Sequence, residues 1–215
     1  MPLKINVSYS EKEEAKSKGA FWDTDSKTWY VPKHKNYNDF IQWIDNEKFS
    51  IIAKKPFHIA LNKRGCWKCN EITDVVALAS NNFYEFDYIN EDDDDNMTKE
   101  WLKQDYFTFF SIPEYIDKEI IDLIQERFPF YKYGYSKTID GKYWANHCQN
   151  CNALQGDFFN HNEPGGAFSP MSIEECKEIT LIEVPSKFDL TLSAGTGWSS
   201  IEDMILKYCK KKEWK

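Results

Sequence analysis

Two Cys-x-x-Cys motifs, separated by 78 residues, constrain the fold of this chain more than any other feature. The first motif is Cys66 with Cys69 in "GCWKCN", and the second is Cys148 with Cys151 in "HCQNCN". Four thiolates from two such turns match the tetrahedral, all-cysteine donor set of structural Zn(II). The sequence therefore predicts that two distant segments fold together around one zinc ion. A site closed by four thiolates has no position for a substrate, so this zinc is expected to be structural.

Other interpretations of the cysteines stay open at the level of sequence. Two separate pairs, buried or redox-active, are one alternative, although a thioredoxin-like motif needs a strand-to-helix junction and both motifs here lie in hairpin contexts. Copper and iron–sulfur centres are less favoured by the spacing. His147, beside Cys148, and His161 are alternative ligands, but hairpin or surface histidines are commoner. Cys176 and Cys209 have no partner motif and are expected to be buried.

Charge is distributed unevenly along the 215 residues, which together carry a net charge of -8. Residues 1–64 contain 12 Lys and Arg residues against 8 Asp and Glu residues, whereas residues 65–215 have a net charge of -12. Only the N-terminal part is therefore expected to attract a polyanion. The run "NEDDDDN" at 90–96 is predicted to be a solvated acidic loop.

Residues 1–50 are predicted to form a small β-α-β-β-α unit. "LKINVSY" alternates apolar and polar side chains as a half-buried strand does, and "SEKEEAKSKG" has a capping-box start and a terminal glycine, as a helix does. "AFW" and "TWYVP" flank a polar turn and predict a hairpin, and "YNDFIQWI" has helical spacing. We expect Trp22 and Trp29 to face the core of this unit, because a strand presents only one face to solvent.

A group of basic and aromatic residues around this hairpin is predicted to bind nucleic acid. Lysine neutralises phosphate charge, and an exposed aromatic ring stacks on unpaired bases. The predicted contacts are Lys16, Lys18, Lys27, Tyr30, Lys33 and Lys35. The expected ligand is a single strand or a junction.

Residues 57–215 are predicted to form a larger zinc-binding α+β domain with a split, zinc-ribbon-like four-cysteine site. "HIALNKRGCWKCNEITDVVALAS" is expected to be a strand, a tight cysteine turn and a second strand. "SIPEYIDKEIIDLIQERF" predicts a helix that starts near Pro113, and "IDGK" predicts a hairpin turn between two strands. "ITLIEV" and "FDLTLS" are expected to be strands, and "SSIEDMILKYCKK" a C-terminal helix. The predicted class of the chain is α+β.

Asp157, His161 and Glu163 lie within seven residues and are candidate acid–base groups. The sequence has no P-loop, dinucleotide-binding fingerprint, Gly-x-Ser-x-Gly or His-Glu-x-x-His motif. Clustered polar residues are also ordinary in glycine-rich turns. We therefore assign no catalytic residue and expect a noncatalytic protein, with a hydrolase-like enzyme that uses Asp157 and His161 as an alternative.

The stretch from Val7 to Trp43 resembles a small domain of unknown function found near the N terminus of TraC-type plasmid DNA primases and in short bacterial and phage proteins. The shared pattern is Tyr-x-Glu-Lys-x-x-Ala-Lys-x-x-Gly-Ala-x-Trp-Asp, then Lys-x-Trp-Tyr-Val-Pro. It is matched here by Tyr9, Glu11, Lys12, Ala15, Lys16, Gly19, Ala20, Trp22, Asp23, Lys27, Trp29, Tyr30, Val31 and Pro32. The resemblance implies a context in mobile-element or phage DNA metabolism. It does not imply primer synthesis, because nothing here resembles the primase catalytic centre.

Two classes of function follow from these patterns. The first is a noncatalytic, zinc-stabilised nucleic-acid-binding or accessory protein. The alternative is an acidic protein-interaction module, an inhibitor or regulator whose residues 65–215 meet a basic partner. The first residues lack the pattern of a secretory signal and no apolar run reaches the roughly 20 residues that span a bilayer, so a cytoplasmic protein without membrane contacts is expected.

Overall fold

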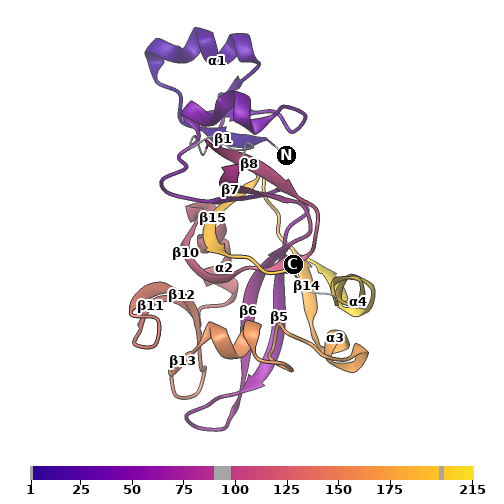
Figure 1. Cartoon of the computed structure of the whole chain (residues 1–215). Helices are drawn as coiled ribbons and strands as arrows, with labels where there is room; N and C mark the ends of the chain where they lie inside the picture. Colours follow the sequence, from indigo (N-terminus) through magenta and orange to yellow (C-terminus); the bar gives the residue numbers. More distant parts are fainter. Residues whose placement is uncertain (1, 90–97, 199–200) are drawn as a thin grey trace.

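The computed structural model describes residues 2–89, 98–198 and 201–215 of the chain. Strands in four sheets predominate, with short helices between them, which confirms the predicted mixed α+β class. The N-terminal unit lies at one end of the molecule, and the turns that follow strands β5 (His58–Gly65) and β12 (Gly141–His147) lie toward the other (Figure 1). The predicted acidic loop at 90–96 falls outside the described residues. In the described ranges no helix is long and apolar enough to cross a membrane.

The N-terminal unit is built on a three-stranded antiparallel sheet with the strand order β1-β3-β2. Its elements are β1 (Leu3–Ile5), a 3-10 turn (Tyr9–Glu11), α1 (Lys12–Lys18), β2 (Phe21–Asp23), β3 (Thr28–Val31) and a second 3-10 helix (Tyr37–Trp43). Helix α1 ends at Gly19, whose φ of 97° is left-handed. This is the conformation that the sequence predicted for the terminal glycine, which has no Cβ to oppose it.

The last element of the unit is a 3-10 helix, so the α-helix predicted for "YNDFIQWI" is wrong in type. Its buried side chains are Tyr37, Phe40 and Trp43, which are spaced by three residues. Three residues make one turn of a 3-10 helix, so this winding places all three rings on the same face. The Asn36 side chain begins the helix by accepting a hydrogen bond from the Asn38 amide.

The two hairpin tryptophans differ in burial, which corrects the expectation that both face the core. Trp29, in the central strand β3, is 9% exposed, whereas its cross-strand neighbour Trp22 is 48% exposed. Trp22 lies in the edge strand β2 and covers Trp29 edge-on, with ring centroids 5.7 Å apart. On the opposite face, Phe21 stacks on Tyr30 at 5.9 Å and is 54% exposed. The hairpin therefore presents aromatic surface on both faces.

Two five-stranded sheets form the body of the molecule. The first has the order β10-β15-β4-β7-β8, with β10 (Ser111–Ile116), β15 (Leu190–Gly195), β4 (Ile51–Ala53), β7 (Phe83–Ile89) and β8 (Thr98–Gln104). The second has the order β16-β14-β5-β6-β9, with β16 (Lys210–Glu213), β14 (Thr180–Glu183), β5 (His58–Gly65), β6 (Ile72–Ser80) and β9 (Thr108–Phe109). All their pairings are antiparallel except that of β14 with β16. The predicted strands on either side of the first cysteine turn, and those at "ITLIEV" and "FDLTLS", are thereby confirmed.

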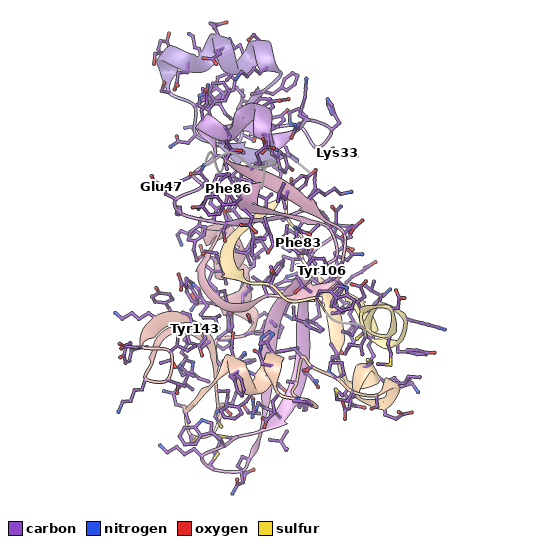
Figure 2. The ribbon with its side chains drawn as sticks, viewed as in Figure 1. Lys33, Glu47, Phe83, Phe86, Tyr106 and Tyr143 are labelled. Atoms are coloured by element: carbon purple, nitrogen blue, oxygen red, sulfur yellow. The ribbon has the colours of Figure 1, made fainter. Side chains whose placement is uncertain are left out.

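The largest hydrophobic core contains side chains from both five-stranded sheets and from helix α2 (Lys118–Arg127). Phe83 of β7 lies within it, with Tyr106 packed edge-on against its ring at 5.2 Å (Figure 2). Ile120, Ile121 and Ile124 bury one side of the helix against the same cluster. This shared core holds the two sheets together.

Helix α2 begins five residues later than the predicted start at Pro113. Residues Ser111–Ile116 form the edge strand β10 instead, where a proline is tolerated because one side of the strand has no ladder partner. The helix is capped by Asp117, whose side chain accepts a hydrogen bond from the Glu119 amide at 3.0 Å. The predicted start was wrong because Pro113 belongs to a strand and the aspartate supplies the cap.

The C-terminal segment contains a strand that the sequence reasoning missed. Helix α3 (Ile173–Glu178) precedes β14, and helix α4 (Glu202–Tyr208) ends before the predicted helical segment does. The Lys210 amide then donates to the Ile179 carbonyl, and β16 pairs in parallel with β14. Residues Lys210–Glu213 thus form a strand because they pair with β14 at the edge of the sheet, although their lysine-rich sequence does not predict a strand.

Polar and apolar contacts join the N-terminal unit to the body. The Tyr37 hydroxyl donates to Asp189 at 2.6 Å, and Lys187 pairs with Asp23 at 2.6 Å. The core of the unit also includes Trp101 of β8. The core of the N-terminal unit is thus completed by a residue of the body. The division into domains of residues 1–50 and 57–215 stays a prediction.

Candidate metal centre

The first cysteine turn connects strands β5 and β6. Cys66 follows β5 directly, and its amide donates to the Glu71 carbonyl at 2.9 Å, which closes the hairpin. Its carbonyl accepts a hydrogen bond from the Asn70 amide at 2.9 Å, and Asn70 has a left-handed φ of 62°. Asparagine tolerates this conformation better than most residues. The turn therefore directs both Cys66 and Cys69 toward one side.

The second cysteine turn repeats the same backbone pattern. It follows β12 (Gly141–His147), which lies between β11 (Tyr131–Ser136) and β13 (Leu154–Gln155) in a three-stranded sheet. The Cys148 amide donates to the Ala153 carbonyl at 2.9 Å, and its carbonyl accepts from the Asn152 amide at 2.8 Å. Asn152 has a φ of 58°. Both motifs are thus Cys-x-x-Cys-Asn turns with a left-handed asparagine.

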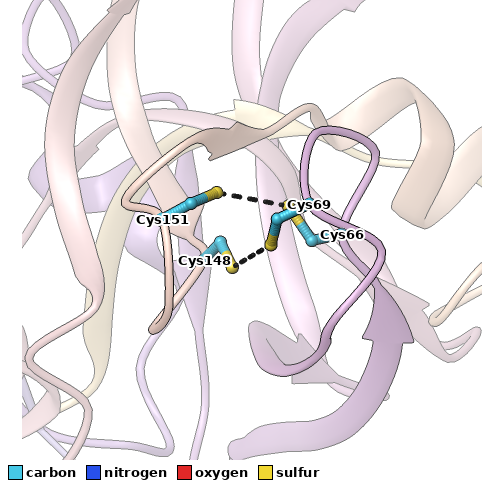
Figure 3. Close-up of side chains that lie close together, drawn as sticks. All are labelled: Cys66, Cys69, Cys148 and Cys151. Atoms are coloured by element: carbon cyan, nitrogen blue, oxygen red, sulfur yellow. Dashed lines mark hydrogen bonds between the residues drawn. The ribbon is translucent and has the colours of Figure 1, made fainter.

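The four sulfur atoms converge between these turns (Figure 3). All four Sγ atoms lie within 4.8 Å of one another; the Cys66–Cys151 and Cys69–Cys148 pairs are 3.6 and 3.7 Å apart. Sulfurs at the corners of a tetrahedron with metal–sulfur bonds of about 2.3 Å would be separated by about 3.8 Å. The donor set therefore fits a four-coordinate metal ion, and its spacing is much longer than a disulfide bond of about 2.05 Å.

Hydrogen bonds between the two segments close the 78-residue gap that separates the motifs. The Asn146 side chain accepts from the Val76 amide at 2.8 Å and donates to the Val76 carbonyl at 2.9 Å, which attaches β12 to β6. The Gln149 amide donates to the Thr73 hydroxyl at 3.1 Å. The Trp67 indole donates to a carbonyl of β13 at 2.7 Å. The convergence thus depends on protein contacts in addition to the sulfur atoms.

Polar groups around the sulfurs favour the thiolate form of Cys66. Its sulfur is approached by the Lys68 amide at 3.4 Å and by the Gln155 side-chain amide at 3.3 Å. Burial opposes ionisation most strongly, but the amides of Cys69 and Lys68, together with the neighbouring thiols, outweigh it and lower the pKa of Cys66 to about 6.

The remaining thiols do not all share this preference. The Cys151 amide is the main cause that lowers the pKa of Cys148. At Cys151 the Ala153 amide has the largest effect and lowers the pKa, but burial and the other three thiols together raise it to about 11. Like charges so close together resist full ionisation, and a divalent cation would remove that resistance.

The histidines considered as alternative ligands lie outside the sulfur cluster. His147 is half-buried, and its Nδ1 lies 3.1 Å from the Ala145 carbonyl, while His161 lies near Asp157. Cys176 and Cys209 are buried in a separate apolar cluster, as expected. The sequence reasoning missed Asn70 and Asn152, although the shared Cys-x-x-Cys-Asn pattern would have identified them.

The predicted nucleic-acid-binding residues occupy different parts of the N-terminal unit. Lys16 and Lys18 of α1 pair with glutamates of the same helix at 2.9 and 3.5 Å. The end of the Lys35 side chain lies over Gly19 at the end of this helix. Tyr30 and Lys33 line a hollow of about 380 Å³ on the boundary with the body of the molecule. The structure thus brings Tyr30 and Lys33 together, and Lys35 with the end of α1.

Asp157 and His161 are brought together by a single π-helical turn, Phe158–Asn162. The His161 Nε2 and Asp157 Oδ2 atoms are 3.9 Å apart, and both side chains are buried. Burial raises the pKa of Asp157 to about 7 and lowers the pKa of His161 to about 3. Glu163 lies outside this pair, on the rim of a separate cleft.

The family comparison matches the N-terminal unit of the chain. Residues 3–45 match the family model of a domain of unknown function (DUF5710). The chain is similar to the DNA primase TraC of Escherichia coli, with 51% identity over 61 residues, or 28% of this chain and 4% of the primase. The chain thus spans only a small fraction of the primase. No solved structure matches. These findings confirm the resemblance of the N-terminal unit.

Proposed function

We propose that this chain is a noncatalytic nucleic-acid-binding or accessory protein of mobile-element DNA metabolism, stabilised by Zn(II). The four thiolates would hold the ion, with Cys66 and Cys69 contributed by one hairpin and Cys148 and Cys151 by the other. Zinc is favoured because it prefers a tetrahedral, all-sulfur set and needs no open coordination position in a structural site. Its role would be to fasten the β5–β6 hairpin to the β11–β13 sheet.

The observation that carries the nucleic-acid assignment is an aromatic surface next to lysines in the unit that resembles part of a DNA primase. Phe21 and Tyr30 stack on each other and Phe21 is more than half exposed. Lys33 and Lys187 line the hollow beside Tyr30. Such a surface suits a single strand, because bases stack on the rings while lysines neutralise the phosphates.

Salt-dependent binding to fluorescent single-stranded DNA and to a junction tests this proposal. We expect Phe21→Ala to weaken single-strand binding by about 5- to 150-fold, the equivalent of about 1–3 kcal/mol for one stacked base. Lys33→Ala should reduce the slope of log affinity against log salt by about 0.7. Tyr133→Ala and Lys142→Ala, exposed positions on β11 and β12, are the matched controls and should bind like the wild type.

Failure to bind DNA or RNA at low salt would overturn the nucleic-acid assignment. Capture of a stoichiometric basic protein by the same preparation would then favour the alternative of an acidic interaction module. The charge of -12 over residues 65–215 supports that alternative.

A further inference from the structure

A cavity of about 290 Å³ lies between strands β9 and β10, the π-helical turn and helix α4. Its walls include the rings of Phe109, Phe168 and Trp198, and Trp198 is 68% exposed at its edge. His161, Asn162 and several hydroxyl groups supply its polar surface. Among the described residues that line it there is no lysine, arginine, aspartate or glutamate. The cavity therefore suits an uncharged ligand.

His161 is the polar group best placed to recognise such a ligand. Its side chain is 7% exposed, and its ring lies against Phe168 at 5.1 Å. The 3.9 Å separation from Asp157 is too long for a hydrogen bond, and within the described ranges neither ring nitrogen has a hydrogen-bond partner. Because burial keeps the imidazole neutral, one nitrogen donates and the other accepts.

A strained residue held by Asp157 lies next to the cavity wall. Ile112 has a φ of 48°, a conformation that is costly for a β-branched side chain. Its amide donates to Asp157 Oδ2 at 2.6 Å, and the adjacent Ser111 lines the cavity. The buried carboxyl group thus holds an irregular segment of β10 against the cavity while His161, one π-helical turn later, faces the cavity. Strain of this kind concentrates at binding sites.

These features together define a class of ligand. Aromatic walls select a planar ring, the uncharged lining selects a neutral compound, and the volume, at the lower end of ligand pockets, selects one ring system. We propose that this cavity binds a neutral heteroaromatic compound of the nucleobase type, with His161 hydrogen-bonded to the donor–acceptor edge of the base. The compound is a free nucleoside or an unpaired base of a strand, which share this chemistry.

The site is independent of the proposed nucleic-acid surface. Phe21, Tyr30 and Lys33 belong to the N-terminal unit at one end of the molecule, whereas the cavity is built from the body (Figure 1). Loss of binding at one site is therefore expected to leave the other intact. Variants in each region distinguish the two proposals.

Calorimetric titration of the zinc-loaded full chain with adenosine, guanosine, cytidine and uridine tests the inference. At least one nucleoside is expected to bind, and its 5′-monophosphate should bind no more tightly, because the described residues that line the cavity include no cation. Trp198→Ala should weaken binding by about 5- to 150-fold through loss of one stacking wall. Tyr9→Ala, an 83% exposed aromatic outside the cavity, is the matched control and should leave the affinity unchanged.

His161→Phe and His161→Gln separate recognition from folding. His161→Phe keeps an aromatic ring without hydrogen-bonding nitrogens and should reduce affinity at least about 10-fold, whereas His161→Gln keeps a donor and an acceptor and should recover part of it. The same variants are titrated with a single-stranded oligonucleotide in the Lys33→Ala background. An effect there, without nucleoside binding, assigns the cavity to an unpaired base. The inference is wrong if neither ligand type binds, or if binding survives both His161→Phe and Trp198→Ala.

Discussion

The buried pair Asp157 and His161 makes a specific prediction about stability and pH. Burial raises the pKa of Asp157 from 3.8 to about 7 and lowers the pKa of His161 from 6.5 to about 3. The carboxyl group therefore stabilises the fold fully at low pH and loses this contribution as pH rises through 7. The histidine acts in the opposite direction, because its contribution is present above pH 6.5 and is lost as pH falls toward 3. The two effects oppose each other between pH 5 and pH 8.

Their magnitudes follow from the linkage between protonation and folding. From pH 5 to pH 8, the free energy of unfolding should fall by about 2.5 kcal/mol because of Asp157. Over the same range it should rise by about 2 kcal/mol because of His161. Tyr131 and Tyr143 face Asp157, but burial raises the pKa of each of these phenols, so they stay protonated over this range. In the wild-type protein, the effects of Asp157 and His161 on the pH dependence of the free energy of unfolding are therefore expected to nearly cancel.

Urea unfolding of zinc-loaded wild type, Asp157→Asn and His161→Gln at pH 5, 6.5 and 8 exposes the two slopes. Relative to wild type, the free energy of unfolding of Asp157→Asn should rise by about 2.5 kcal/mol from pH 5 to pH 8. That of His161→Gln should fall by about 2 kcal/mol. Groups common to all three proteins, including the metal-site thiols, cancel in these differences. Three parallel pH curves would refute the reasoning.

Three further predictions concern the metal centre and the attachment of the N-terminal unit. Elemental analysis should find about one zinc per chain. Cys66→Ser should lose the metal and destabilise the fold, whereas the control Cys176→Ser should keep the metal. A wild-type protein that is fully folded without metal would contradict this prediction. Asn70→Ala should cost about 1–2 kcal/mol and Asn70→Gly much less, because the left-handed φ penalises a Cβ; equal losses in thermal unfolding would count against it. Tyr37→Phe removes the 2.6 Å bond to Asp189 and should lower the free energy of unfolding by about 1–3 kcal/mol in urea, and an unchanged value would show that this contact does not secure the unit.

Local patterns alone predicted the parts of the protein whose physics is local. Alternation of apolar residues identified the first strand, β1, and the glycine at the end of α1 adopts the predicted left-handed conformation. The Cys-x-x-Cys spacing identified four candidate ligands that the structure brings within 4.8 Å. These features need only neighbouring residues, so their signals are contained in short stretches of sequence.

Other local signals were misleading because tertiary contacts overrode them. Ser111 and Pro113 resemble a helix start, but the sheet edge at β15 takes residues 111–116 as a strand. Trp22 has a large aromatic side chain of the kind usually found in a core, yet its position on the edge strand leaves it half exposed. Propensity is a weak preference, and burial against a distant partner decides between alternatives of similar energy.

The sequence by itself determined the four candidate cysteine ligands, the mixed α+β class and the family resemblance of the N-terminal unit. Only the tertiary structure decided how the 78-residue gap closes, since that depends on the Asn146 side chain reaching Val76 across two sheets. It alone also placed His161 in a cavity whose described walls come from segments 107–111, 161–169, 196–198 and 201–205. The physical reason is that burial and hydrogen-bond geometry depend on distances between residues far apart in the chain, and short sequence patterns do not encode those distances.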